Sequence, residues 1–342
     1  MNRNKKVIRM GIDVGKKMFH LFGVDEAGLE AVKKKLRRKQ VLGYFANLPP
    51  CLVAMEACGG SHYWARELGK LGHEVKLISP QFVKPYVKGN KNDYNDAEGI
   101  CEAAGRPNMR FVTVNSVEQQ DIQGLHRIRQ SVVKQRTALA NQMRGLLGEY
   151  GIVIGNGIYR VRRRVPEILE DGENGLTDRF RGWLAELLES LYVLEARIKQ
   201  YDQEIEQVYA TNEVCQRLGA IEGIGPKSAT AVIATYSDGK QFRNGRQFAA
   251  SIGLVPRQHT TGDKPVLLGI SKHGDRYLRT LLIHGARSVI RRIAGKDDRR
   301  SRWLQALVAR CGKNKAAVAL ANKNARIIWA LLRRGECYRA AR

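Results

Sequence analysis

The chain has 342 residues, of which 43% are hydrophobic and 27% charged, a composition with enough apolar residues for at least one globular core. Lys and Arg number 59 against 33 Asp and Glu, so the formal net charge is +26. This excess indicates a polyanionic partner. The chain has no apolar run of about 20 residues and no C-x-x-C pair, which argues against a membrane protein, a zinc protein or a disulfide scaffold. We expect a cytoplasmic protein, with no membrane association, that acts on nucleic acid.

Residues 1–112 are predicted to form an α/β domain. A hairpin turn at Asp25-Glu26-Ala27-Gly28 joins the second and third strands, with glycine in the position that such turns favour. The predicted strands cover residues 7–13, 18–24, 29–35, 51–56 and 75–78, and the predicted helices cover residues 40–47, 61–71, 80–88 (a short helix or a loop) and 93–104. This succession, βββαβαβα, is that of the ribonuclease H-like fold.

Four acidic residues of this domain are candidate metal ligands. Asp13 and Glu56 end two strands that would be neighbours in the sheet, and Asp93 and Asp96 share one face of a helix because they are three residues apart. Converging carboxylates repel one another unless cations lie between them, and such oxygen ligands suit Mg²⁺ or Mn²⁺. A pair of these ions supports phosphodiester chemistry. The alternative is structural: each acid could instead cap a turn or the first turn of a helix.

Residues 113–210 are predicted to form a coiled-coil helical hairpin. Its two apolar stripes contain Leu125, Ile128, Val132, Leu139, Met143 and Leu146 in the first helix, and Leu184, Leu187, Leu191, Leu194, Ile198, Tyr201, Ile205 and Val208 in the second. The second stripe steps alternately by three and four residues, which is the heptad pattern. Residues 151–177, with several glycines and Pro166, are predicted to connect the helices. The heptads do not indicate whether the partner helix is in the same chain or in another copy.

Positive charge is concentrated in the last third of the chain. Residues 1–110 have a net charge of +9, residues 111–210 of −1, and residues 211–342 of +18. We therefore expect the C-terminal segment to provide the main surface for a polyanion, with an affinity that falls steeply with salt. A generic basic face, as on ribosomal proteins, is the alternative.

Residues 211–342 are predicted to form a mostly helical domain. The sequence Ile221-Glu222-Gly223-Ile224-Gly225-Pro226 precedes a helical stretch, a pattern typical of a helix-hairpin-helix, in which glycines allow backbone N–H groups to approach a phosphate. Helices predicted at 276–293 and 301–332 carry Arg and Lys on several faces. The predicted nucleic-acid contacts are Gly223, Gly225, Lys227, Arg257, Lys272, Arg276 and Arg279. A connecting loop without any ligand is the alternative.

Ser251 lies in a segment rich in small residues, 248–256. If Arg257, Lys272 and Arg276 surround it, their charges would lower its pKa and hold a phosphate, as a nucleophile in phosphoryl transfer requires. A serine between alanine and isoleucine is more often a packing residue, so the residues alone leave both roles open. No spacing indicates a Ser-His-Asp triad.

Several motifs together resemble those of a known family. They are Gly11-Ile12-Asp13-Val14, Met55-Glu56-Ala57-Cys58, Asn90-Lys91-Asn92-Asp93-Tyr94-Asn95-Asp96-Ala97, Ala250-Ser251-Ile252-Gly253-Leu254-Val255-Pro256 and Gly269-Ile270-Ser271-Lys272. The chain resembles the DEDD transposases of the insertion-sequence 110 family, more closely their insertion-sequence 1111 branch, to which Piv-type DNA invertases are related. One departure is Tyr94-Asn95, which is bulkier than the small residues expected between the last two acids.

The resemblance implies a RuvC-like N-terminal domain, a coiled-coil segment and a C-terminal transposase domain. It implies that Asp13, Glu56, Asp93 and Asp96 hold Mg²⁺ (or Mn²⁺), and that Ser251, with Ser271 as the second choice, forms a covalent phosphoserine link to DNA. It also implies a composite active site in a homo-dimer or homo-tetramer, and a structured bridge RNA that pairs with donor and target DNA.

Two other functions fit the residues. A structure-selective endonuclease, such as a junction resolvase, would use the same four acids and attack with water, leaving Ser251 without a catalytic role. An architectural protein would use only the basic surface and would have no active site.

Overall fold

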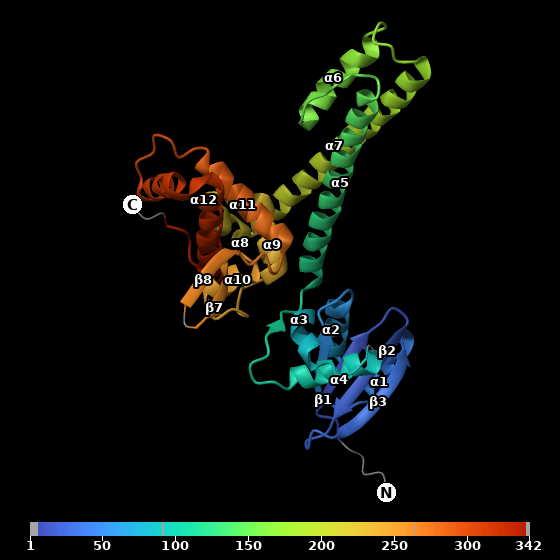
Figure 1. Cartoon of the computed structure of the whole chain (residues 1–342). Helices are drawn as coiled ribbons and strands as arrows, with labels where there is room; N and C mark the ends of the chain where they lie inside the picture. Colours follow the sequence, from blue (N-terminus) through green and yellow to red (C-terminus); the bar gives the residue numbers. More distant parts are fainter. Residues whose placement is uncertain (1–5, 91, 263, 340–342) are drawn as a thin grey trace. The chain divides into compact units, whose positions relative to one another are not determined.

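The computed structural model describes residues 6–90, 92–262 and 264–339; Lys91, in the third motif, lies outside them. The chain divides into two compact units, Met1–Ser116 and Val117–Arg342, which Figure 1 shows in blue to cyan and in green to red. The predicted further division at residue 210 remains a prediction.

The first unit is built on a six-stranded mixed sheet with the strand order β3-β2-β1-β4-β5-β6. Its strands are β1 (Arg9–Val14), β2 (Met18–Val24), β3 (Glu30–Arg37), β4 (Leu52–Glu56), β5 (Glu74–Ile78) and β6 (Phe111–Val112). The first three are antiparallel, whereas β4 and β5 run parallel to β1. All five predicted strands are confirmed, and Gly28 of the predicted hairpin turn has a φ of +75°. Strand β6 was not predicted, because a two-residue strand leaves no periodic pattern.

Helices cover both faces of this sheet. They are α1 (Val41–Ala46), α2 (Ser61–Lys70), α3 (Pro80–Val83) and α4 (Asp93–Ala104), with 3-10 turns at Arg38–Gln40 and Lys84–Tyr86. The predicted helices are therefore confirmed, and the bounds of α4 agree with the prediction. Phe45 of α1 and Trp64 of α2 pack in one core cluster with strand residues, while Ile100 of α4 belongs to a second cluster.

The alternation of side chains along the strands decides what faces α4. In β1, Met10 and Ile12 point into the cluster with α1 and α2, so Gly11 and Asp13 face the other side of the sheet. In β4, Val53 and Met55 lie in the first cluster and Ala54 in the second, which places Glu56 on the same face as Ala54. The α4 face thus combines small residues with the predicted acids.

The second unit begins with the predicted antiparallel hairpin, in which α5 (Val117–Gly148) packs along α7 (Asp178–Thr211) (Figure 1). Every second position of the α7 heptad, namely Leu184, Leu191, Ile198 and Ile205, is buried, and the intervening positions are half-buried. The partner of this stripe is therefore α5 of the same chain.

Two features of the hairpin differ from the sequence-based expectation. Ile128 and Leu146, expected in the first stripe, are exposed, whereas Val132 and Met143 of the same stripe are buried together with Ile122, which was not predicted. The connecting segment contains a helix, α6 (Ile158–Glu170), with Pro166 in its interior. Val161, Val165 and Ile168 bury the apolar face of α6, and this packing outweighs the cost of proline.

The rest of the second unit is mostly helical, as predicted. Its elements are α8 (Glu213–Gly219), α9 (Pro226–Tyr236), α10 (Gly245–Ser251), β7 (Pro256–Thr261), β8 (Lys264–Ile270), α11 (Arg276–Ile290) and α12 (Arg299–Arg334). The β7–β8 hairpin was not predicted, and α12 bends at Gly312, which has a φ of +81°. No helix in the described part of the chain is both long and apolar enough to cross a membrane.

Candidate active site

The strand register brings Asp13 beside two other polar residues. In the β1–β2 hairpin, Asp13 is paired directly with His20. In the parallel β1–β4 pair, Ile12 is aligned with Met55, so Asp13 and Glu56 are the next residues along two adjacent strands. These pairings place two of the four predicted acids, together with a histidine, at one end of the central strands.

The other two predicted acids come from the first turn of α4. Asn92 caps this helix by accepting a hydrogen bond from the backbone N–H of Tyr94 at 2.9 Å. The helix lies unusually close to β1, because a Cβ on Gly11 would be only 2.1 Å from the carbonyl oxygen of Ala97. This close approach sets the first turn of α4, with Asp93 and Asp96, against the end of β1.

The charges of the two acids of α4 act on the carboxylates at the ends of the strands. Burial and the charges of Asp93 and Asp96 raise the pKa of Asp13, while His20 acts in the opposite direction. Burial and the charges of Asp13 and Asp96 raise the pKa of Glu56. The structure therefore places Asp13 and Asp93 within ligand reach of each other, with Glu56 and Asp96 near enough for their charges to act on the same group of carboxylates.

His20 belongs to the same cluster and was not predicted from the sequence. Its Nδ1 lies 3.4 Å from Asp93 Oδ2, and potential ligand atoms of Asp13, His20 and Asp93 all lie within 4.8 Å of one another. The available signal was the hairpin, whose register places residue 20 opposite residue 13. Strand alternation alone does not identify His20 as a possible ligand, because a single histidine in an apolar strand is as compatible with a packing role.

The residues present fit a divalent cation. His20 is only 5% exposed, and its Nδ1 has no hydrogen-bond partner among the residues that the structure describes. A buried nitrogen that makes no hydrogen bond, with the Asp93 carboxylate 3.4 Å away, is a donor that a bound cation would satisfy. The side chain of Asp93 is 62% exposed, so the cluster is also open to a substrate.

Ser251 is the last residue of α10 and is half-buried. Its hydroxyl donates to the carbonyl oxygen of Phe248 at 2.8 Å and lies 3.1 Å from the hydroxyl of Tyr236. Burial raises the pKa of Tyr236 to about 12, so this neighbour stays neutral and is unsuited to act as a general base. Ser271, the second choice, has a buried Oγ without a hydrogen-bond partner in the described part of the chain.

The predicted arginine and lysine contacts fall into two groups. Arg257, Lys272 and Arg276 are exposed on β7, in the loop after β8 and at the start of α11. Arg279, in contrast, is 9% exposed, and its Nη1 donates to the carbonyl oxygen of Ile252 at 2.8 Å. The structure gives Arg279 an internal role, because its guanidinium holds the loop that follows Ser251.

The predicted helix-hairpin-helix consists of α8, a short loop and α9. Gly223 in this loop has a φ of +88°, and a Cβ there would be 2.9 Å from the carbonyl oxygen of Gly285 on α11. Gly223 is thus required by the close packing of the loop on α11. Gly225 caps α9, and a Cβ at this position would meet no atom within 4 Å.

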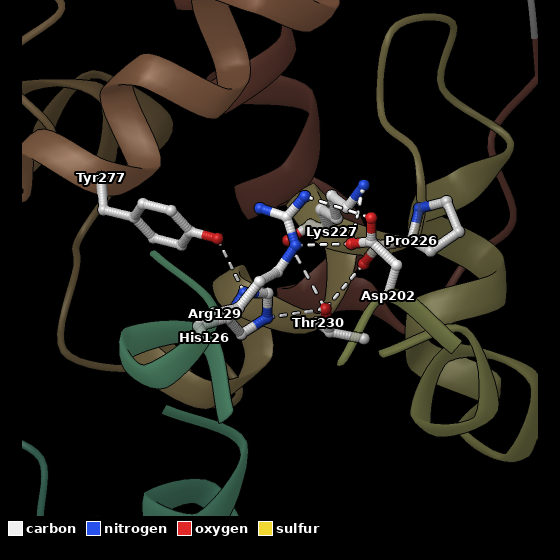
Figure 2. A network of polar contacts seen from close by, with 7 residues as sticks. All are labelled: His126, Arg129, Asp202, Pro226, Lys227, Thr230 and Tyr277. Atoms are coloured by element: carbon white, nitrogen blue, oxygen red, sulfur yellow. Dashed lines mark hydrogen bonds and ion pairs between the residues drawn. The ribbon is translucent and has the colours of Figure 1, made fainter. Parts of the chain in front are cut away.

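Lys227 is held in a polar network rather than projecting freely (Figure 2). Its Nζ lies 2.9 Å from Asp202 Oδ1, and Arg129 forms a two-pronged contact with the same carboxylate at 2.5 and 3.2 Å. These charge contacts join α5 and α7 of the hairpin to α9. Any phosphate would have to compete with Asp202 for Lys227.

Comparison with known proteins identifies the class. Residues 10–152 match the family model DEDD_Tnp_IS110, described as a transposase, and residues 215–303 match the transposase IS116/IS110/IS902 family. The chain, which combines a mixed α/β unit bearing clustered acids with a basic helical unit, is thus a transposase, an enzyme that processes DNA.

The relatives agree over nearly the full length. A probable family 20 transposase of Pseudomonas aeruginosa is 54% identical, with 97% of this chain and 98% of the relative covered. The transposase for insertion sequence element IS1111A of Coxiella burnetii is 49% identical, with 98% and 93% covered. The transposase for insertion sequence element IS1328 of Yersinia enterocolitica is 42% identical, with 97% and 98% covered. The chain belongs to the IS110 family of insertion-sequence transposases.

Proposed function

We propose that this transposase cuts and rejoins DNA strands with a metal site formed by Asp13, Glu56, Asp93 and Asp96, and with a serine nucleophile at Ser251. The observation that carries the proposal is the convergence of the four carboxylates at the ends of β1 and β4 and at the start of α4. The order of the first five strands, β3-β2-β1-β4-β5, supports a RuvC-like, ribonuclease H-like assignment of the first unit.

The acids would hold Mg²⁺, or Mn²⁺, against the scissile phosphate. When bound, such ions make an attacking oxygen more reactive and stabilise the negative charge on a leaving oxygen. Asp13 and Glu56 come from rigid central strands, so the protein fixes their positions before substrate arrives. The exposed carboxylate of Asp93 lies on the open side of the cluster, where DNA would enter.

Ser251 would attack the phosphorus atom, forming an Oγ–P bond while the bond to the leaving 3′ or 5′ oxygen breaks. For this attack its hydroxyl has to leave the carbonyl oxygen of Phe248, and its proton has to pass to a base other than Tyr236. Arg257, Lys272 and Arg276, which are exposed near the same segment of sequence, would hold the phosphate.

Two further parts of the proposed function are a guide RNA and an oligomeric assembly. We propose that a structured bridge RNA pairs with donor and target DNA, and that a homo-dimer or homo-tetramer supplies the acids and the serine from different protomers. The net charge of +18 over residues 211–342 supports binding of more than one nucleic-acid strand.

The test measures strand exchange and covalent protein–DNA adducts, with the full chain, the element's ends, RNA transcribed from its noncoding end, and Mg²⁺. We expect Asp13→Asn to abolish both products and Ser251→Ala to abolish the adduct. Glu98→Gln, which changes another acid of α4, is the matched control and should stay active. Ser271→Ala distinguishes the two serines.

Other outcomes would select the competing functions. Cleavage at the normal rate by Ser251→Ala and Ser271→Ala, with no adduct from the unmodified chain, would establish a water-dependent endonuclease. Full activity of Asp13→Asn would remove the metal site. Salt-sensitive, unspecific DNA binding without any cleavage would indicate an architectural protein. Strand exchange without added RNA would contradict the proposed guide RNA.

A further inference from the structure

We propose that His20 is a fifth ligand of the metal site, contributing its Nδ1 beside the carboxylates of Asp13 and Asp93. This inference rests on the proposed function, because it concerns the same site. It adds a nitrogen ligand to a set of oxygen ligands, and it predicts that the site binds Mn²⁺ in preference to Mg²⁺.

The first observation is the geometry of the three residues. The β1–β2 register pairs His20 with Asp13, and α4 brings Asp93 onto the same face of the sheet. One ligand atom of each residue lies within 4.8 Å of the others. Three donors at this spacing can all reach one ion placed between them with small side-chain rotations.

The second observation is the state of the imidazole nitrogen. Nδ1 of His20 is shielded from solvent and, within the described residues, makes no hydrogen bond, even though Asp93 Oδ2 lies 3.4 Å away. Native proteins rarely leave a buried nitrogen unsatisfied, because its lost hydration is not replaced. A cation bound at Nδ1 would remove this deficit and the repulsion between the acids together.

The third observation is that the ring is held in this orientation. Tyr94 packs edge-on against His20, with a centroid separation of 4.8 Å and an interplanar angle of 74°. Lys33 of β3 in turn lies over the Tyr94 ring, 5.4 Å from its centroid. Tyr94, which the sequence marked as unexpectedly bulky between the last two acids, thereby fixes the direction of the His20 lone pair.

The chemistry of the set follows from its donors. Mg²⁺ strongly prefers oxygen ligands, whereas divalent ions of the first transition row readily accept imidazole nitrogen. Within that row, Mn²⁺ binds least tightly and the affinity rises toward Cu²⁺. An Asp-His-Asp set with further carboxylates therefore favours Mn²⁺ over Mg²⁺. With Nδ1 as the ligand, the imidazole proton resides on Nε2.

The direct test is pulsed electron paramagnetic resonance of Mn²⁺ bound to the unmodified full chain, which detects ¹⁴N coupling from a coordinated imidazole. We expect that coupling, and we expect Asp13→Asn to abolish Mn²⁺ binding. His20→Phe keeps a ring against Tyr94 but removes the nitrogen, so it should lose the ¹⁴N coupling. It should also weaken Mn²⁺ binding by about tenfold or more, with a smaller effect on Mg²⁺.

His284→Phe, at an exposed histidine on α11, is the matched control and should change neither quantity. Mn²⁺ that binds in an Asp13-dependent manner without ¹⁴N coupling would overturn the role of His20 as a ligand and leave the metal site intact. Absence of Asp13-dependent Mn²⁺ binding would overturn both. Even if the His20→Phe variant folds poorly, the measurement on the unmodified chain can still overturn the proposal.

Discussion

Gly11 shows how a single residue without a side chain determines the geometry of the acid cluster. It lies two residues before Asp13 on β1, where a Cβ would be 2.1 Å from the carbonyl oxygen of Ala97 and 2.5 Å from the backbone nitrogen of Cys101. The backbone of α4 is therefore in direct contact with the strand. Any side chain at position 11 would move α4, and with it Asp93 and Asp96, away from Asp13.

We expect Gly11→Ala to lower the free energy of unfolding by about 1–3 kcal/mol, the usual cost of overpacking, and to weaken binding of Mn²⁺. Urea unfolding and titration with Mn²⁺ measure the two effects. Gly43→Ala, in α1, adds a Cβ that meets no atom within 4 Å and should be neutral or slightly stabilising. Equal behaviour of the two variants would contradict the role assigned to Gly11.

The hairpin of α5 and α7 is joined to α9 and α11 by polar contacts that surround a buried histidine, His126 (Figure 2). The Thr230 hydroxyl donates to the carbonyl oxygen of Pro226 at 2.7 Å, so it accepts from His126 Nε2 at 3.0 Å. Nδ1 of His126 then accepts from the Tyr277 hydroxyl at 2.9 Å. In this arrangement both ring nitrogens are satisfied in the neutral form of His126.

The network predicts a pH dependence of stability. Burial, with the charges of Arg129 and Lys227, lowers the pKa of His126 to about 4 from 6.5. Between these values the unfolded chain binds more protons than the folded chain. The free energy of unfolding should therefore fall as the pH falls through this range, by about 2 kcal/mol from pH 7 to pH 5.

The measurement is urea unfolding at pH 7 and pH 5, compared with His126→Gln, which cannot titrate. The variant should be less stable than the unmodified chain at pH 7. Its free energy of unfolding should lack the decrease between pH 7 and pH 5 that is due to His126. If the unmodified chain and the variant respond equally to pH, His126 does not titrate as the network requires.

Across the whole molecule, charge is the property that most clearly separates its parts. The net charge of +26 predicts that affinity for unspecific duplex DNA falls by about a thousandfold or more between 50 and 200 mM salt, as for a surface that contacts six or more phosphates.

Two cations of this surface should behave differently. Arg257→Ala, at an exposed residue, should reduce the slope of log affinity against log salt by about one. Lys227→Ala should reduce it less, because Asp202 already neutralises Lys227. Fluorescence anisotropy over a salt series measures both slopes, and a larger effect of Lys227→Ala would show that the Asp202 contact opens when DNA binds.

Much of this molecule follows from local patterns in its sequence. Strand alternation and heptad spacing repeat every two to seven residues, so they predicted the strands of the first unit and the buried stripe of α7. The four acids were recognisable as well, because each lies at the end of a predicted strand or in the first turn of a helix. The β7–β8 hairpin was missed because nearly all of its residues are exposed, so its strands show no buried face. Helix α6 was missed because Pro166 and the neighbouring glycines indicated a connecting loop, although Val161, Val165 and Ile168 follow helical spacing.

What only the tertiary structure decided are the contacts between residues far apart in the chain. His20 becomes a candidate ligand through strand register and the packing of Tyr94, Arg279 becomes internal through a carbonyl group 27 residues away, and Lys227 is neutralised by an acid on another helix. The sequence determines which residue types are available and on which local face they lie. Which of them lose water and find a partner depends on how the elements pack, and packing is a property of the folded chain.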